Sequence, residues 1–385
     1  MQLLSMKQTS RIISTYSADV FGVCSALFEL GGMTVMHDAS GCNSTYSTHD
    51  EPRWYDIDSM VYISGLSEME AIIGDDEKLI GDIVAAAREL HPKFIAVAGT
   101  PIPAMTGFDF TAVAELIEQR TGIPAFGFDT TGMNTYVHGA SMALAGIARR
   151  FVKADISKTK GPSVNILGLT PLDFSVNGTD ASIVHFLEDA GYEVISRWAM
   201  GSTLEQLEQA GSAHVNLVVS AAGLGAAKVL RERFNTPYVV GVPMGAAFAE
   251  QLKAALRTAG ETGQIQAPTS RLPGEEIVVI GESVTALSLA SAIELETGRG
   301  VKVLCTTECD QSVLRNKDRQ TLFEEEIAAE LTTAKLVIAD PLFRPICPQN
   351  VRFLELPTEA FSGRIYRERI PNLVSDFQKF LCEVM

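Results

Sequence analysis

A short turn near the start of the chain carries the side chain best suited to redox chemistry. Residues 37–42 read His-Asp-Ala-Ser-Gly-Cys and directly follow the apolar run 33–36. A strand that ends in a tight turn presents Cys42 beside backbone amide groups, which stabilise a thiolate and the charge of an iron-sulfur cluster. The turn therefore predicts a metal ligand at Cys42, with a structural thiol as the alternative.

The other cysteines give weaker signals. Cys24 lies among apolar residues of a helical stretch, where a cysteine often belongs to the core. Cys305 and Cys309 form a Cys-x-x-x-Cys pattern beside the end of a strand, which either holds metal or is structural, and the structural interpretation is favoured. Cys347 and Cys382 receive the same structural interpretation.

Composition excludes several classes of function. The chain has 385 residues, of which 46% are hydrophobic and 20% are charged, and its net charge is -16. This acidic balance argues against sequence-independent nucleic-acid binding and against attraction to an anionic membrane. No apolar stretch reaches membrane-spanning length, and the first residues lack the pattern of a signal peptide, so we expect a cytoplasmic protein.

Helical and strand patterns alternate along the chain. Helical apolar periodicity marks residues 78–90, 111–119 and 182–190, and a short apolar run typical of a buried strand follows each. We predict strands at residues 33–36, 94–98, 123–128, 164–169, 193–197, 216–220, 238–242, 277–281, 301–305 and 336–339. This alternation predicts an α/β fold with parallel sheets covered on both faces and ligands at the carboxyl ends of the strands.

Two polar stretches, residues 153–162 and 263–274, interrupt the alternation. Polar stretches of this kind are typical of linkers between domains. We therefore predict three Rossmann-like α/β domains with boundaries 1–155, 156–270 and 271–385. The first of them would carry the cluster-binding loops.

Four motifs, in order, resemble the nitrogenase component 1 superfamily, which includes the molybdenum-iron protein subunits, their assembly scaffold and the dark-operative protochlorophyllide reductase subunits. The family has a strand followed by His-Gly-Pro-x-Gly-Cys, and His37, Gly41 and Cys42 match that motif. Residues 64–79 and 99–109 resemble two further family segments. Residues 216–238 resemble a segment of its middle domain.

The resemblance implies a fold, a cofactor and partners. It implies three nitrogenase component 1-like domains and a [4Fe-4S] cluster between paired subunits, which receives electrons from a separate ATP-dependent iron protein. A cubane cluster usually takes four ligands, so Cys24 and Cys42 from each subunit of a homodimer would supply them, or a paralogous subunit would contribute the missing thiolates. The chain has no Gly-x-x-x-x-Gly-Lys-Ser/Thr segment, so it should not hydrolyse ATP by itself.

The resemblance also assigns candidate residues. His37, Gly41, Glu68 and Thr100 match positions near the family's cluster loops, and Thr100 stands where nitrogenase-type subunits have a third cysteine. The alternative for His37 is that it only caps a strand end, and the alternative for Glu68 is that it is a helix-capping carboxylate without a chemical role. Ser220 stands where the catalytic subunit of nitrogenase holds its metal cofactor through a cysteine, which argues against that cofactor here. The substrate-side candidates are Thr100, Asp129, Thr131, Asn134, Asp173 and Ser220.

We therefore expect a nitrogenase-like reductase that passes electrons to an unidentified small molecule held between its domains. The alternative is a binding or assembly scaffold of the same fold, which carries a metallocluster or a tetrapyrrole without turnover. A clusterless binding protein is the third interpretation, and it requires Cys24 and Cys42 to be core residues.

Overall fold

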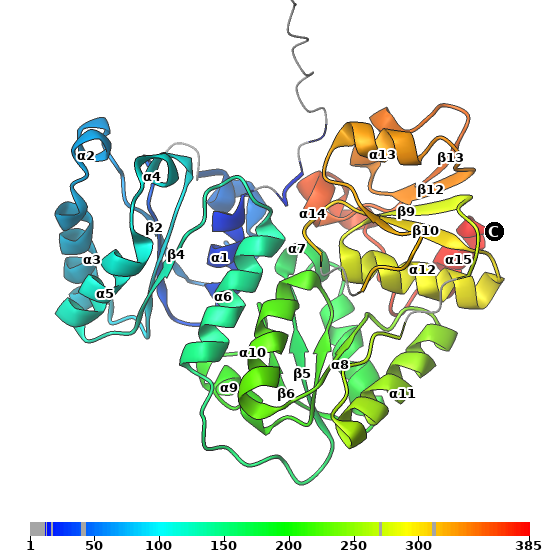
Figure 1. Cartoon of the computed structure of the whole chain (residues 1–385), viewed down its shortest axis with the longest axis horizontal. Coiled ribbons are helices and arrows are strands. Elements are labelled where there is room, and N and C mark those ends of the chain that lie inside the picture. Colours follow the sequence, from blue (N-terminus) through cyan, green and yellow to red (C-terminus); the bar gives the residue numbers. More distant parts are fainter. Residues whose placement is uncertain (1–11, 13, 17, 40–43, 269–271, 310–312) are drawn as a thin grey trace, which may run out of the picture.

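The computed structural model describes residues 12, 14–16, 18–39, 44–268, 272–309 and 313–385. Its strands form three sheets, and within the described residues every strand pair is parallel. Figure 1 shows the units around these sheets as lobes that meet at a common centre, with the first at the left, the second below and the third at the right. The predicted α/β fold with three parallel sheets is confirmed.

The first unit has the strand order β2-β1-β3-β4. Its strands are β1 (Met33–Met36), β2 (Met60–Ile63), β3 (Ile95–Ala98) and β4 (Ala125–Phe128). Its helices are α1 (Asp19–Leu27), the π-helical turn η1 (Tyr46–Asp50), α2 (Glu68–Ile73), α3 (Asp76–Leu90), α4 (Pro101–Thr106), α5 (Phe110–Thr121) and α6 (Tyr136–Arg150).

The second unit has the strand order β6-β5-β7-β8. Its strands are β5 (Ser163–Leu167), β6 (Glu193–Arg197), β7 (Val215–Val218) and β8 (Tyr238–Val240). Its helices are α7 (Pro171–Phe174), α8 (Thr179–Asp189), α9 (Leu204–Leu207), η2 (Ala210–Ser212), η3 (Ala221–Gly223), α10 (Leu224–Phe234) and α11 (Ala246–Thr262).

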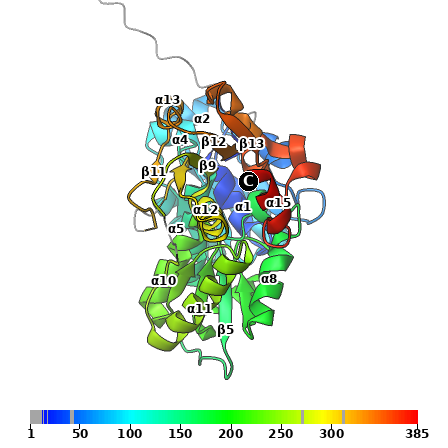
Figure 2. The ribbon, with the colours of Figure 1, turned by 90° about the vertical axis from the view of Figure 1, so that its right-hand side faces the viewer.

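The third unit has the strand order β11-β10-β9-β12-β13. Its strands are β9 (Ile277–Gly281), β10 (Val301–Cys305), β11 (Arg319–Gln320), β12 (Leu336–Ala339) and β13 (Arg352–Glu355). Its helices are α12 (Ser283–Thr297), α13 (Glu324–Glu330), η4 (Pro341–Ile346), α14 (Glu359–Ser362), η5 (Gly363–Arg369) and α15 (Phe377–Val384). In Figure 2, α12 and α15 lie above α8 and α11 of the second unit.

Helix α3 illustrates how the sequence pattern builds a layer. Its apolar residues at helical spacing are buried, and they belong to a core cluster that also contains Ile95 and Val97 of β3. The helix ends at His91, whose left-handed backbone (φ 49°) closes the last turn. Helix and strand are therefore fixed by the same apolar residues that predicted them.

Two glycines bring α1 and α6 into backbone contact. A Cβ atom on Gly22 would lie 1.9 Å from the carbonyl oxygen of Tyr136, and one on Gly139 would lie 1.8 Å from that of Asp19. No larger residue fits without movement of a helix. This contact buries every residue of α1.

The three units meet around Tyr16. Its backbone N–H donates to the carbonyl oxygen of Ala360 at 2.9 Å, and its hydroxyl donates to the carboxylate of Asp173. Its ring stacks on Tyr136 and meets Phe361 edge-on, with centroids 5.8 and 5.2 Å apart. Residues before α1 thus contact the third unit, although they belong to the first segment of the sequence. The domain boundaries at 155 and 270 stay predictions.

Within the described part of the chain, no helix combines the length and the apolar surface that crossing a bilayer requires.

Candidate functional site

The carboxyl ends of β1, β2 and β3 bring four polar residues together, as expected for neighbouring parallel strands. We call His37, Asp38, Ser64 and Thr100 the strand-end cluster. The Thr100 hydroxyl lies 2.9 Å from the carbonyl oxygen of His37 and 3.1 Å from a carboxylate oxygen of Asp38. The Asp38 N–H donates to the Ser64 hydroxyl at 3.1 Å. His37 and Thr100 therefore lie at the same edge of the sheet.

The His37 ring is fixed and uncharged at neutral pH. Its Nδ1 lies 2.9 Å from the Ser64 hydroxyl, and the ring packs on Phe108 at 4.5 Å between centroids. Burial lowers the pKa of His37 to about 4. A small pocket beside the ring is lined in part by Glu70 and Lys78.

Gly41 and Cys42 lie outside the described residues, so their predicted roles stay predictions. The chain reaches them directly from His37 and Asp38 of the strand-end cluster. It leaves them toward η1, whose following residues Glu51 and Arg53 are buried. Packed polar side chains thus hold the chain directly before the predicted ligand turn, whereas after it Ser44 and Thr45 are exposed and the buried residues Glu51 and Arg53 follow at some distance.

A buried ion network holds the segment that follows η1. Arg53 Nε lies 2.7 Å from one carboxylate oxygen of Glu51, and Arg53 NH1 lies 2.7 Å from Glu29. The guanidinium also donates to the carbonyl oxygens of Ser25 at 2.9 Å and Ala199 at 3.0 Å. Burial opposes the charge of Arg53, but the neighbouring Glu51 and Glu29 raise the pKa of Arg53 above its usual value, so the guanidinium stays charged. The network ties this segment to α1 and to the second unit.

Glu68 is exposed in the first turn of α2 and is not the residue that caps it. Ser67 is the N-cap, and it forms a reciprocal capping box with Glu70. Glu70, which sequence reasoning passed over, also lines the small pocket beside His37. The Ser-x-x-Glu pattern of residues 67–70 was the signal that could have identified it. Asp109, by contrast, does cap α5.

Cys24 occupies a position unlike that of a surface ligand. It lies in the middle of α1, its side chain is 0% exposed, and it belongs to the main hydrophobic core. Burial, with Glu51 nearby, raises the pKa of its thiol well above the usual range. The surroundings therefore favour a protonated core thiol over a thiolate shared with a second subunit, and a ligand role for Cys24 stays a prediction.

The remaining predicted residues lie in other parts of the molecule. Ser220 follows β7, is 1% exposed, and donates to the carbonyl oxygen of Gly168 at 2.6 Å. Thr131 and Asn134 donate to Asp19 through a backbone and a side-chain N–H. The buried Asp19, which sequence reasoning missed, thus organises the turn before α6. Asp129 is exposed.

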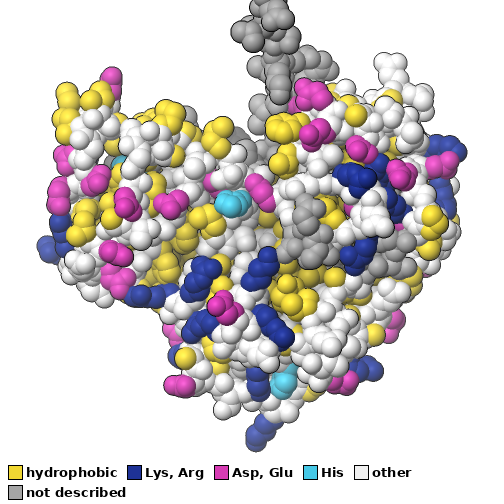
Figure 3. Space-filling model, viewed as in Figure 1, with side chains coloured by type: hydrophobic (Ala, Val, Ile, Leu, Met, Phe, Trp, Pro, Cys, Tyr) yellow, Lys and Arg dark blue, Asp and Glu magenta, His cyan; other side chains and the backbone are white. Residues whose placement is uncertain are grey.

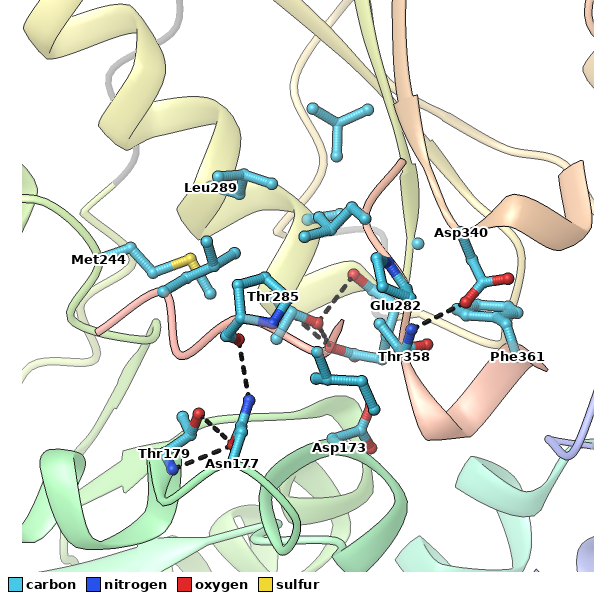
Figure 4. Close-up of a pocket in the computed structure, with 18 of the residues that line it drawn as sticks. Asp173, Asn177, Thr179, Met244, Glu282, Thr285, Leu289, Asp340, Thr358 and Phe361 are labelled. Atoms are coloured by element: carbon cyan, nitrogen blue, oxygen red, sulfur yellow. Dashed lines mark hydrogen bonds between the residues drawn. The ribbon is translucent and has the colours of Figure 1, made fainter. Parts of the chain in front are cut away.

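Asp173 lines a pocket between the second and third units (Figure 4). The cavity itself has a volume of about 90 Å³, which becomes about 730 Å³ when the adjoining space open to solvent is included, and we call it the interdomain pocket. Its wall combines apolar side chains with a few polar ones: Met244, Leu289, Phe361, Asp173, Thr179, Glu282, Thr285, Asp340 and Thr358. Such a lining suits a mainly apolar molecule with few polar groups.

The pocket carboxylates differ in their surroundings. Glu282 caps α12 and accepts from the N–H of Ala221 at 2.9 Å, so it joins the two units. Asp340 accepts from the N–H of Thr358 at 2.8 Å. Burial and then the nearby Glu282 raise the pKa of Asp173 to about 7. Asp173 is therefore able to hold or release a proton near neutral pH.

Among the residues that the structure describes, no group of three or more histidine, cysteine, aspartate or glutamate side chains could hold a metal ion. A cluster site therefore needs Cys42, side chains of a partner subunit, or both.

The family model described as nitrogenase component 1 type oxidoreductase matches residues 20–336. The nitrogenase iron-molybdenum cofactor biosynthesis protein NifE of Clostridium pasteurianum is 25% identical over 179 residues, which cover 46% of this chain and 38% of the relative. A light-independent protochlorophyllide reductase subunit of Chlorobium phaeobacteroides is 30% identical over 172 residues, which cover 44% of this chain and 32% of the relative. The match with each thus spans about a third of the relative's length.

A solved structure of nitrogenase Cp1 at pH 6.5 aligns with a TM-score of 0.67 and 16% sequence identity. The alignment covers 100% of this chain and 96% of that chain, and at this identity it shows the fold alone. The family match, by contrast, covers most of the sequence. The chain therefore belongs to the nitrogenase component 1 type oxidoreductases.

Proposed function

We propose that this protein is a nitrogenase-like reductase subunit. It receives electrons from an ATP-dependent iron protein through a [4Fe-4S] cluster at a subunit contact and reduces a small unsaturated molecule. The strand-end cluster is the observation that carries the proposal, because it fixes the chain at the point where it enters the turn with Cys42. The similarity to a light-independent protochlorophyllide reductase supports a redox role.

The residues of this edge suit a cluster held jointly with a partner. We assign Cys42 as the ligand from this chain and give Cys24 a core role because it is 0% exposed. Thr100 is engaged with the backbone of His37 and offers no thiolate. The partner subunit would supply the other ligands, which favours a paralogous partner over a homodimer. When bound, such a cluster supplies a one-electron relay.

An exposed apolar surface adjoins the strand-end cluster and supports a subunit contact there. Helices α2 and α4 start just after Ser64 and Thr100 and contact each other. Their exposed apolar side chains are Met69, Ile72, Ile73, Ile102 and Met105, and we call them the apolar face. Figure 3 shows hydrophobic side chains gathered over these helices at the upper left. Exposed apolar patches often mark sites where a protein contacts another protein.

The interdomain pocket is the proposed place of the substrate. Its wall is mainly apolar, and its carboxylates are already bonded inside the protein, so they fix the shape of the pocket. Asp173, with a pKa of about 7, is the wall residue suited to hold a proton at its carboxylate for a substrate that takes up electrons. Tyr16 and Thr170 donate to the same carboxylate and orient it.

A scaffold without turnover is the second candidate. The similarity to the cofactor biosynthesis protein NifE favours it. So does Ser220, which uses its hydroxyl on Gly168 and offers no soft ligand to a cofactor. Under this alternative the same pocket would hold a tetrapyrrole or a nascent cluster.

The iron content of single variants tests the ligand assignment. The full chain is purified without oxygen together with any subunit that accompanies it, and iron and cluster absorbance are measured. We expect Cys42→Ala to lose the cluster and Cys382→Ala to keep it, because Cys382 is an exposed residue of α15. Cys24→Ala should also keep it. Full iron content in Cys42→Ala would refute the assignment.

Electron transfer separates the reductase from the scaffold. The cluster is first oxidised, and the iron protein with ATP is then added while the absorbance of the cluster is followed. The cluster of a reductase is reduced only when ATP is present. A cluster that stays oxidised under these conditions, in protein with full iron content, rejects the reductase and leaves the scaffold.

A further inference from the structure

Two thiols lie together at the carboxyl end of β10, outside both sites described above. Cys305 is the last residue of that strand and pairs with Gly281 on one side and Gln320 on the other. Its side chain is 0% exposed. Cys309 is partly exposed, and its side chain lies within hydrogen-bonding reach of the Cys305 thiol.

Two neighbouring thiols can stay reduced side by side, bind a soft metal ion or form a disulfide. Among the described residues no third ligating side chain joins them to make a metal site. The residues between them, Thr306, Thr307 and Glu308, form a short loop that lets the two sulfur atoms meet. We propose that Cys305 and Cys309 form a reversible disulfide in this protein.

The two cysteines have different roles in the exchange. The hydrogen bond with Cys309, and then burial, raise the pKa of Cys305 well above the usual range, so Cys305 keeps its proton while Cys309 is accessible. A small-molecule disulfide is the oxidant. The Cys309 thiolate attacks it, the S–S bond of the oxidant breaks, one thiolate leaves, and a mixed disulfide forms.

Cys305 completes the exchange. Its proton passes to the thiolate that left the oxidant in the first step, its sulfur attacks the sulfur of Cys309, and the second thiolate of the oxidant leaves. Two protein thiols are then oxidised to one disulfide, and the oxidant is reduced to two thiols.

The loop between the cysteines contacts the first unit, which gives the disulfide a structural consequence. The Glu308 carboxylate accepts from the backbone N–H of Thr135 at 3.2 Å and from the Thr135 hydroxyl. Thr135 is the N-cap of α6. The loop also borders a pocket lined by Tyr16, Thr306 and Thr307. Closing the disulfide moves Cys309 toward Cys305 and shifts Glu308, so the oxidation state is coupled to the contact between the third and first units.

Peptide mass spectrometry of the full chain tests the proposal. The protein is equilibrated at increasing ratios of glutathione disulfide to glutathione, the remaining thiols are alkylated, and the peptide of residues 303–315 is analysed. We expect a change from two alkylated cysteines to none with a loss of two hydrogens, reversed by added reductant. Two alkylated cysteines at every ratio would overturn the proposal.

Variants assign the order of the exchange. Cys305→Ser should retain glutathione on Cys309, because the second step is missing, whereas Cys309→Ser should leave Cys305 unmodified. Cys382→Ser is the matched control and should behave as the parent protein does. If Cys305→Ser does not fold, the alkylation of the parent protein and of Cys309→Ser still shows whether the disulfide forms. If zinc ions protect both thiols from alkylation without any oxidant, the pair is a metal site and the proposed disulfide is refuted.

Discussion

Arg53→Met removes the cation from the buried network beside the predicted ligand turn. The guanidinium makes two bonds to Glu51, at 2.7 and 2.9 Å, and one to Glu29 at 2.7 Å. Methionine keeps much of the side-chain length but has no positive charge and no donors. The carboxylate of Glu51, which is 0% exposed, would then remain in the interior without its cation.

The expected loss is large because the partner stays buried. Removing one member of a buried ion pair typically costs about 3 to 5 kcal/mol of unfolding free energy, whereas replacing both members is often close to neutral. Arg53→Met should therefore destabilise the protein by about that amount. The double variant Glu51→Gln/Arg53→Met should recover part of the loss.

Urea unfolding followed by tryptophan fluorescence measures the effect, since Trp54 directly follows Arg53 in the sequence. Arg120→Met is the matched control, because Arg120 pairs with Glu77 at the surface, where 40% and 69% of the two side chains are exposed. Exposed ion pairs of this kind contribute little to the free energy of unfolding. We expect almost no change in the control.

The same variant tests the link to function. If the network positions the segment after Cys42, Arg53→Met should also bind less iron under conditions where it is still folded. An unfolding free energy equal to that of the parent protein would refute the energetic argument. A destabilised variant with full iron content would refute the positioning argument alone.

Three further predictions concern single residues. Gly139→Ala should lower the free energy of unfolding by about 1 to 3 kcal/mol, because its Cβ would lie 1.8 Å from the Asp19 carbonyl oxygen. Gly146→Ala on the same helix is the control, because the nearest neighbour of its Cβ lies at 3.5 Å, and it should unfold at the same urea concentration as the parent or at a higher one. Asp173 has a raised pKa of about 7, so ionising it lowers the free energy of unfolding as pH rises from about 4 to 7, by at most about 4 kcal/mol. Asp173→Asn should lack this part of the pH dependence in urea unfolding. His37 has a lowered pKa of about 4, so the parent protein loses stability as pH falls from about 6.5 to 4, and His37→Gln should lose less in thermal unfolding over that range.

Sequence patterns predicted the central strands and the outermost strands β4, β6 and β8, but they missed the outermost strands β2, β11 and β13. β3 and β9 are continuous apolar runs, and β7 is interrupted only by the buried Asn216, because helices cover both faces of the sheets. β2 and β13 are outermost strands in their sheets. In β13 the charged residues Arg352 and Glu355 leave an apolar run of only two residues, which is too short to identify a strand. The run Met60–Ile63 of β2 is apolar throughout and was overlooked.

The candidate site was predictable where it follows from topology. Residues after neighbouring parallel strands must meet at one edge, and His37 and Thr100 do so. The surroundings of Cys24 were not predictable, because every residue of α1 is buried in the folded chain, where Gly22 of α1 and Gly139 of α6 let the two helices meet. A helix buried all round has no apolar stripe that would distinguish a core position from a surface one.

Helix α1 connects the two parts of the proposed function. The chain just before it places Tyr16 on Asp173, in the wall of the interdomain pocket. Its last turns supply the Ser25 carbonyl oxygen that accepts from Arg53, and Glu29 just beyond the helix binds the same guanidinium. Because the backbone contact with α6 leaves α1 no room to shift, the pocket and the flank of the Cys42 turn are held in a fixed relation by one rigid element. This is what an electron relay requires of its protein, since donor and acceptor must keep their separation while the chemistry at each end changes.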